Sequence, residues 1–474
     1  MSTEEHLQDE GLEALDSTDW IVTKIGGLNA CDFRGNFERI DRNRISGKKQ
    51  VVVISVLRTG DFNTTTHLNG LAQILMRKGE GYAERAGLAI QEIEQKLRGI
   101  IQENVEGEWQ PSLFRILETF VGQLSHYVEM TEIAKFPTQG KDFLIQFDGE
   151  VFSISGWGED LVEALYKAYF AEKGKIAAEI SIDRQEIYRT PEVLRERYHD
   201  AVAAILNEDL LITGGYEAEL ARTRSYSDPK AALLTESLAH HGARAVLAVE
   251  KQQPILSADP SILPNSAVPI RVMSSKFAAE VFGVLGAEAG ALHPLVLPIL
   301  NGSNAKIVVF NPARPELGTT CIYANAVMPP TTLISRKLVP TIRVYGPMSD
   351  EKGIAEEVMR ALSEFNLDQI YTAENEVRVT LSANGEVEDI QKIGKGYTHT
   401  IQNRSVVMCV STDDEIARGI TVLRDHDIKV ESSSFVAEVG NDPHVNVSSY
   451  VVEPEVSTAA VTHLHNTFVT KYAA

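Results

Sequence analysis

The sequence predicts an α/β protein: a three-layer αβα domain with a mainly parallel sheet, followed by two small ferredoxin-like (βαββαβ) modules. Two apolar, β-branched runs, Trp20–Ile25 and Gln50–Ser55, flank a segment with helical spacing, and this β-α-β order is typical of a parallel sheet covered by helices. After Pro330 short strands alternate with single helices, which favours ferredoxin-like modules over the alternative of one irregular α+β domain. A chain of 474 residues also exceeds what one hydrophobic core usually supports.

The N-terminal domain is expected to span residues 19–330. Apolar residues recur at helical spacing from His67 to about Ile133, and Gly158-Glu159 is expected to head a further helix. The other elements expected here are, in chain order, helix Asp32–Arg44, helix Asp160–Glu172, helix Lys230–His240, strand Ala245–Val249, helix Lys276–Leu285 and strand Lys306–Phe310.

The C-terminal tandem is expected to span residues 336–474. Each module should contribute strands and at least one helix, because apolar runs of strand length alternate with amphipathic segments. The expected elements are strand Val339–Tyr345, helix Gly353–Asn366, strands Ile370–Thr372, Val377–Leu381 and Ser405–Val410, helix Asp413–His426, strands Ile428–Glu431 and His444–Val452, and helix Glu455–Lys471.

Composition and charge narrow the functional class. A net charge of −21 disfavours nonspecific binding to nucleic acid or to an anionic membrane, and no apolar stretch is long enough to span a bilayer. Three widely spaced cysteines argue against a disulfide framework or a structural zinc site, so a cytoplasmic location is expected. Residues 1–18 are rich in carboxylates and lack Lys and Arg, which predicts a disordered acidic tail.

The first strand carries a lysine near its end and runs into two glycines. Lys24 would add a positive charge for phosphate, while Gly26 and Gly27 allow the backbone to approach an anion closely. An ordinary strand-to-helix turn explains the same residues. The segment is not a Walker A loop, because the required spacing and the Gly-Lys-Ser/Thr ending are absent.

The order of short motifs along the chain favours the phosphate-binding interpretation over an ordinary turn. From about Trp20 to the C-terminus the sequence resembles the aspartokinase branch of the amino-acid kinase family. The segments that carry the resemblance are Trp20–Gly27, Val51–Ser55 with Arg58–Gly60 and Thr64–Thr66, Gly158-Glu159, Ile212–Tyr216, Arg224–Asp228 with Ala231–Leu234, Ser257–Pro260, His293-Pro294, and Asn311-Pro312 with Gly318-Thr319.

The resemblance implies an enzyme that transfers the γ-phosphoryl group of ATP, with Mg²⁺, to the side-chain carboxylate of L-aspartate or a related acidic amino acid. Lys24 and Asp228 would be the catalytic residues, and Gly26 and Gly27 would bind the nucleotide's phosphates. The loop Ser257–Pro260, with Ser257 and Asp259, would lie beside the nucleotide. No metal-ligating residue is predicted.

Three further residues would bind the acidic amino acid. Arg224 would pair with a substrate carboxylate through two parallel hydrogen bonds, Glu159 would accept the α-ammonium group, and Ser55 would add a polar contact. Structural explanations stay open for two of them. Arg224 and Asp228 could form a surface ion pair, and Glu159 could simply favour a helix dipole. His293 is expected to pack rather than react.

Several motif positions depart from the family pattern, mainly on the nucleotide side. Leu28-Asn29 replaces Thr-Ser, Glu250-Lys251 and Gln253-Pro254 replace residues near the nucleotide, and Gly290 stands where the family has a lysine. A catalytically impaired paralogue that binds an amino acid or acts as a regulatory subunit is therefore the alternative to an active kinase.

The C-terminal tandem resembles the ACT domains of aspartokinases, chiefly through Leu367–Thr372 and Glu376–Thr380. ACT domains bind feedback amino acids and pair across subunits, so the resemblance implies an allosteric amino acid and a homodimer or higher homo-oligomer. A tandem that serves dimerisation alone is the alternative.

Overall fold

A computed structural model of the chain describes residues 14–15, 17–60, 62–77, 81–130, 144–147, 150–180, 191–215, 227–289, 292–293, 295–329, 331–345, 367–373, 376–381, 398–436 and 445–469. The chain divides into two compact units. The first comprises Met1–Pro254 and Ala291–Tyr323, and the second comprises Ile255–Gly290 and Ala324–Ala474.

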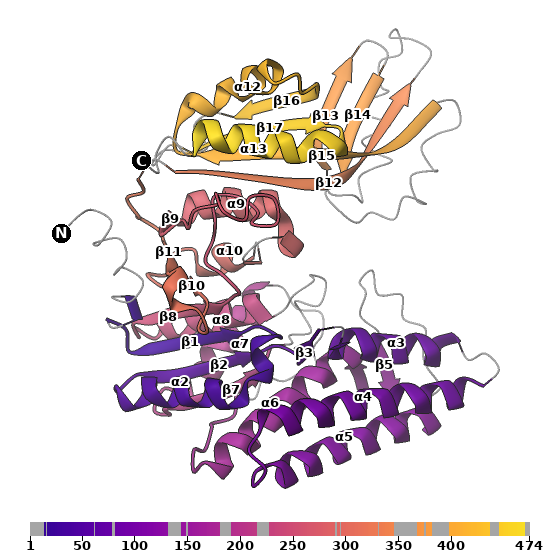
Figure 1. Cartoon of the computed structure of the whole chain (residues 1–474). Helices are drawn as coiled ribbons and strands as arrows, with labels where there is room; N and C mark the ends of the chain where they lie inside the picture. Colours follow the sequence, from indigo (N-terminus) through magenta and orange to yellow (C-terminus); the bar gives the residue numbers. More distant parts are fainter. Residues whose placement is uncertain are drawn as a thin grey trace. The chain divides into compact units, whose positions relative to one another are not determined.

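The first unit is built on a mainly parallel sheet (Figure 1). β1 (Trp20–Ile25) lies in its middle and pairs in parallel with β2 (Lys49–Ile54) and β8 (Ala245–Glu250). Every residue of β1 is buried, as expected for a strand covered on both faces. The order continues outwards to β7 (Leu210–Gly214) beside β2, and to β10 (Lys306–Phe310) and the antiparallel β11 (Thr319–Tyr323) beyond β8.

Helices cover both faces of this sheet, which confirms the predicted αβα architecture. The connection from β1 to β2 through α2 (Phe33–Ile45) runs in one direction along the sheet, and that from β7 to β8 through α8 (Ser227–His240) runs in the other. Because such crossovers are right-handed, α2 and α8 lie on opposite faces. α6 (Ile154–Glu172) packs beside α2 and against β7, while α7 (Pro191–Ala203) and α10 (Val296–Leu300) pack on α8.

Three helices lie side by side next to α6 (Figure 1). They are α3 (Thr64–Arg77), α4 (Tyr82–Asn104) and α5 (Gln110–Met130), and they match the helical spacing of the sequence. Their buried apolar faces join the aromatic side chains of α2 and α6, where the rings of Phe33 and Tyr166 stack with centroids 4.6 Å apart. Two hairpins flank these helices, β3 (Arg58–Thr59) with β4 (Phe62–Asn63) and β5 (Leu144–Phe147) with β6 (Glu150–Ser153).

Two expectations about this unit need correction. Gly158 and Glu159 do not head a helix, because α6 already begins at Ile154. Gly158 instead favours close packing of α6 on α3, because a Cβ at this position would lie 3.0 Å from Leu68 Cδ1. Near the N-terminus, Ala14 and Thr18 are buried, so packed structure begins within the segment predicted to be a tail.

The second unit contains an antiparallel sheet in the order β13-β14-β12-β15-β17-β16. Its two long strands, β12 (Thr332–Tyr345) and β15 (Thr398–Ser411), pair along their whole length and are shared by two four-strand arrays. The other strands are β13 (Leu367–Ala373), β14 (Glu376–Leu381), β16 (Val430–Val436) and β17 (Asn446–Val452).

This strand order is that of two ferredoxin-like modules, as predicted. The first array consists of β12, β13, β14 and β15, numbered 1 to 4, and has the spatial order 2-3-1-4. The second array has the same order when β15, β16 and β17 are numbered 1 to 3 and β12 is numbered 4. α12 (Gly419–Asp425) and α13 (Ser457–Phe468) pack on the second array. The predicted helix Gly353–Asn366 lies outside the described residues.

The segment Ile255–Gly290 belongs to the second unit although it lies between β8 and α10 in sequence. It supplies β9 (Val272–Ser274) and α9 (Ser275–Ala289), and α9 packs on β12 and β15. Ala258 and Leu263 share a buried apolar core with Cys409, Leu464 and Phe468.

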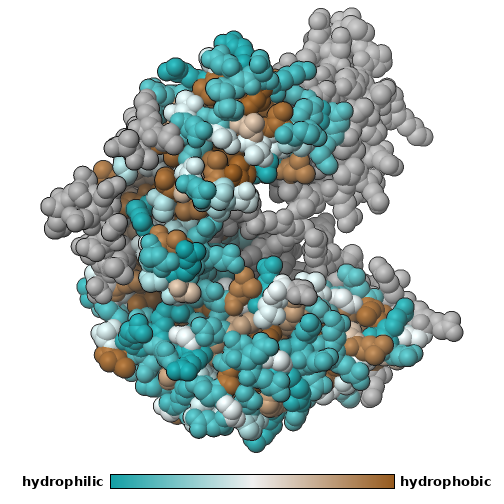
Figure 2. All heavy atoms as spheres, in the orientation of Figure 1, coloured by the Kyte–Doolittle hydropathy of each residue, from teal (hydrophilic) through white to brown (hydrophobic). Residues whose placement is uncertain are grey.

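On the face shown in Figure 2, apolar residues are scattered among hydrophilic ones. Within the described ranges, no helix is long and apolar enough to cross a membrane. Cys31, Cys321 and Cys409 are buried and unbridged.

Candidate active site

Four parallel strands of the first unit end at one edge of the sheet. The register places Lys24 of β1 level with Val53 of β2 and Val249 of β8, and Val53 level with Thr213 of β7. The residues that follow these positions therefore gather at the carboxyl edge, where parallel α/β sheets usually bind ligands.

Lys24 and Asp228 form a buried ion pair at this edge. Lys24 Nζ lies 2.8 Å from Asp228 Oδ1, and the two side chains are 6% and 3% exposed. Asp228 stands in the first turn of α8 and also accepts a hydrogen bond from the amide of His293, at 3.2 Å. Burial alone would raise the pKa of Asp228, but Lys24, Lys251 and this amide outweigh it and hold that pKa well below its usual range.

A second lysine shares the same carboxylate. Lys251, the first residue after β8, places its Nζ 3.5 Å from Asp228 Oδ2. Burial lowers the pKa of Lys251, and the neighbouring charge of Lys24 lowers it further, while Asp228 opposes both effects.

Glu159 is the second carboxylate at the edge, and α6 carries it. Burial raises its pKa to about 8, although the positive charges of Lys230 and Lys24 act in the opposite direction. Its Oε2 atom is buried and has no hydrogen-bond partner among the described residues. A buried carboxyl oxygen without a partner is costly, and a cationic ligand group would satisfy it.

Two glycines after β7 make room for this carboxyl group. A Cβ at Gly214 would lie 2.9 Å from the backbone oxygen of Glu159, and one at Gly215 would lie 2.8 Å from Glu159 Oε2 and 2.4 Å from Ser227 Cβ. Any side chain at Gly215 would therefore displace Glu159 or the start of α8. The Gly-Gly pair at this strand end is a packing requirement of the site.

The remaining predicted residues of this edge lie where the sequence places them. Ser55 follows β2, and its hydroxyl donates to that of Ser227 across 2.8 Å. Gly26 and Gly27 follow β1; a Cβ at Gly27 would lie 2.7 Å from the carbonyl oxygen of Val56, so close backbone contact requires glycine there.

Glu250, the last residue of β8, is engaged by the protein itself. Its side chain is fully buried, forms an ion pair with Arg39 of α2, and accepts a hydrogen bond from Asn29 at 3.3 Å. Burial raises its pKa, and the charge of Arg39 and the Asn29 hydrogen bond offset part of that effect. Asn29, a departure from the family motif, therefore binds a neighbouring carboxylate.

The carboxylates of this edge were also compared with the requirements of a metal site. The described residues contain no group of three or more His, Cys, Asp or Glu side chains that could hold a metal ion. In this structure Asp228 pairs with two lysines and Glu250 with Arg39.

Three further site residues were predicted from the sequence. Arg224 lies outside the described residues. Ser257 and Asp259 belong to the second unit, where the Ser257 hydroxyl accepts a hydrogen bond from the amide of Val268 and lies 3.0 Å from His465 Nε2. Asp259 Oδ1 accepts from the amide of Ser261.

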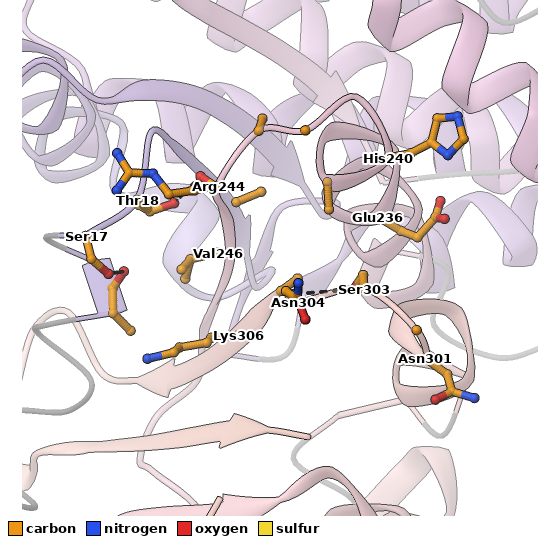
Figure 3. Close-up of a pocket in the computed structure, with 17 residues that line it drawn as sticks. Ser17, Thr18, Glu236, His240, Arg244, Val246, Asn301, Ser303, Asn304 and Lys306 are labelled. Atoms are coloured by element: carbon orange, nitrogen blue, oxygen red, sulfur yellow. Dashed lines mark hydrogen bonds between the residues drawn. The ribbon is translucent and has the colours of Figure 1, made fainter. Parts of the chain in front are cut away.

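A large cavity lies at the opposite edge of the same sheet (Figure 3). It has a volume of about 590 Å³ and opens where β8 and β10 begin, at Ala245 and Lys306. Arg244, Asn304 and Glu236 contribute polar groups to its wall. None of the predicted site residues lines it, so this cavity is distinct from the carboxyl-edge cluster.

The chain combines a three-layer αβα unit, built on a mainly parallel sheet, with two ferredoxin-like modules, and this is the fold of solved aspartokinases. Three solved structures share it over nearly the whole chain. E. coli aspartokinase III in complex with lysine and aspartate (T-state) is 19% identical with a TM-score of 0.64, and covers 95% of this chain and 100% of its own. The same enzyme with aspartate and ADP (R-state) gives 20% identity, a TM-score of 0.66, and 94% and 99% coverage.

Clostridium acetobutylicum aspartate kinase is the third, with 17% identity, a TM-score of 0.64, and coverage of 94% of this chain and 100% of its own. At these identities the likeness demonstrates a shared fold. No protein-family model matches the sequence. A search of curated proteins also finds no match.

Proposed function

We propose that this protein is an aspartate kinase, which phosphorylates the side-chain carboxylate of L-aspartate with ATP. The observation that carries the proposal is the convergence of Lys24, Asp228 and Glu159 at the carboxyl edge of an aspartokinase fold. Cationic groups beside a glycine turn suit a phosphoryl group, and the carboxyl group of Glu159, whose Oε2 atom lacks a hydrogen-bond partner among the described residues, suits an ammonium group. Together they match the two substrates.

The reaction needs no strong general base. One oxygen of the substrate carboxylate attacks the γ-phosphorus, the bond from that phosphorus to the bridging β,γ-oxygen breaks, and ADP leaves with the bond's electron pair. Catalysis then consists mainly of in-line positioning and of stabilising charge on the transferred group. Lys24 would supply that charge next to the N–H groups of Gly26 and Gly27, while Asp228 holds Lys24 in place.

Mg²⁺ would enter as part of the substrate, Mg-ATP. Phosphate oxygens, rather than protein carboxylates, would be its ligands, because the carboxylates of Asp228 and Glu250 are already engaged. Ser257 and Asp259 stay proposed nucleotide contacts. Within the second unit the hydroxyl, amide and carbonyl groups of Ser257 already have hydrogen-bond partners.

The acidic amino acid would bind on the Glu159 side. Glu159 would accept the α-ammonium group, Arg224 would bind a carboxylate, and Ser55 would add a hydroxyl contact. The E. coli enzyme, of similar fold, was solved with aspartate and with lysine. By analogy, the ACT-like tandem would bind a feedback amino acid and join subunits of a cytoplasmic homo-oligomer. We propose 19–330 and 336–474 as the kinase and regulatory domains.

A coupled assay of ADP formation tests the proposal. Purified protein should release ADP from Mg-ATP when L-aspartate is present, and Lys24→Met should slow this release by about 10²-fold or more. A protein that binds aspartate in a calorimeter but neither binds nor turns over Mg-ATP would instead be the regulatory paralogue. The departures from the family motif at Leu28-Asn29 and Gly290, on the nucleotide side, are the reason for testing the regulatory alternative.

A further inference from the structure

Lys251 stands at the end of β8 beside the glycine turn that follows β1. Its amide donates to the carbonyl oxygen of Phe310 at 2.9 Å, which fixes the backbone where the chain leaves the sheet. A Cβ at Gly26 would lie 3.5 Å from the carbonyl oxygen of Glu250, so the turn and this strand end touch. Lys251 therefore belongs to the wall on which a phosphate group would lie.

The charges around Lys251 do not balance. Lys24 and Lys251 share the single carboxylate of Asp228, which leaves one positive charge uncompensated. Glu250 does not supply the missing negative charge, because Arg39 and Asn29 engage it. Nor does Glu159, which burial keeps largely protonated at neutral pH. Two ammonium groups that share one carboxylate favour the approach of a further anion.

The two lysines differ in accessibility. The Lys24 side chain is 6% exposed, whereas that of Lys251 is 27% exposed. Lys24 is held closely by Asp228, while the 3.5 Å separation of Lys251 from Asp228 leaves its ammonium group donors for another partner. Lys251 is thus the more accessible of the two cations.

We propose that Lys251 is a second phosphate-binding lysine, which contacts the anionic oxygens of a nucleoside triphosphate bound over the Gly26-Gly27 turn. The inference rests on the proposed kinase function and adds a residue to the nucleotide side, which looked eroded in sequence.

Calorimetry with Mg-ADP and, separately, with L-aspartate tests this role. Lys251→Met should weaken Mg-ADP binding at least tenfold and change aspartate affinity less than twofold, while Lys251→Arg should retain part of the Mg-ADP affinity. Lys306→Met is the matched control, because Lys306 starts a neighbouring strand at the opposite edge and packs over Tyr323. It should bind both ligands as the wild type does.

The possible outcomes separate this inference from the proposed function. If the wild type binds Mg-ADP and Lys251→Met binds it equally well, Lys251 has no phosphate role and the kinase proposal stands. Loss of both ligands together, with a lowered melting temperature, would make Lys251 a structural residue and also overturn the inference. A wild type that binds no Mg-ADP would refute the kinase function and this role with it.

Discussion

The wild type should release a proton when it binds aspartate, and Glu159→Gln should abolish this proton release. Burial raises the pKa of Glu159 to about 8, so at pH 7 the free protein carries the carboxyl group about 90% protonated. An ammonium group beside Oε2 favours the ionised form and lowers that pKa. Binding should then release about 0.9 proton per site at pH 7.

The same linkage fixes how affinity depends on pH. Because the ligand binds the ionised form of Glu159, affinity should rise about ninefold from pH 6 to pH 7 and level off above pH 8. Calorimetry in two buffers of different ionisation enthalpy at pH 7 gives the proton number as a slope. Glu159→Gln should bind more weakly, with a slope near zero and no pH dependence over this range.

Two results would refute this reasoning. A wild type that releases no proton would mean that Glu159 is already ionised or does not meet the ammonium group. Equal proton release from the wild type and Glu159→Gln would place the titrating group elsewhere. The second result would leave the kinase fold untouched but would remove Glu159 from the amino-acid site.

Four further outcomes are expected. The raised pKa of Glu159 means that the native state binds the proton more tightly than the unfolded state does. Ionisation of this group therefore reduces stability as pH rises from about 4.5 to 8, by about 1.4 kcal/mol per unit of pKa difference. Glu159→Gln should accordingly raise the melting temperature at pH 8 and not at pH 4. Lys24→Met should lower kcat by about 10²-fold or more, measured by ADP release. Gly215→Ala should abolish aspartate binding in calorimetry, because the new Cβ meets Glu159 and Ser227, whereas Gly99→Ala, which meets no atom within 4 Å in α4, should bind normally and melt slightly higher. Ser257→Ala should cost about 1–3 kcal/mol in urea unfolding of the second unit, because it deprives His465 and the Val268 amide of a buried partner.

Much of the first unit could be predicted from local pattern. The β-branched runs of β1 and β2 and the helix between them depend on neighbours in sequence, and so does the place of Lys24 next to the glycines. The start of α6 could not be predicted in this way. Gly158 suggested a helix boundary, yet it serves close packing against Leu68, a contact made across 90 residues of sequence.

The site shows the same division. Ser55 and Gly26 can be placed at the site because each directly follows a predicted strand. Lys251 can be assigned to the site only from its distance to Asp228, which no local sequence pattern predicts. Ser257, which a motif suggested as a nucleotide contact, also has its hydroxyl 3.0 Å from Nε2 of His465, 208 residues away, a contact that no local pattern predicts. Long-range contacts of this kind also explain the length of β12 and β15, which pair with each other along their whole length. The sequence predicted only the parts Val339–Tyr345 and Ser405–Val410 of these two strands.

The most direct test of the central claim is to identify the product. Protein incubated with L-aspartate, Mg-ATP and hydroxylamine should yield the β-hydroxamate of aspartate, which forms when hydroxylamine traps the acyl phosphate, in an amount equal to the ADP released. Absence of the hydroxamate with a folded protein that binds aspartate would contradict the assignment as an aspartate kinase.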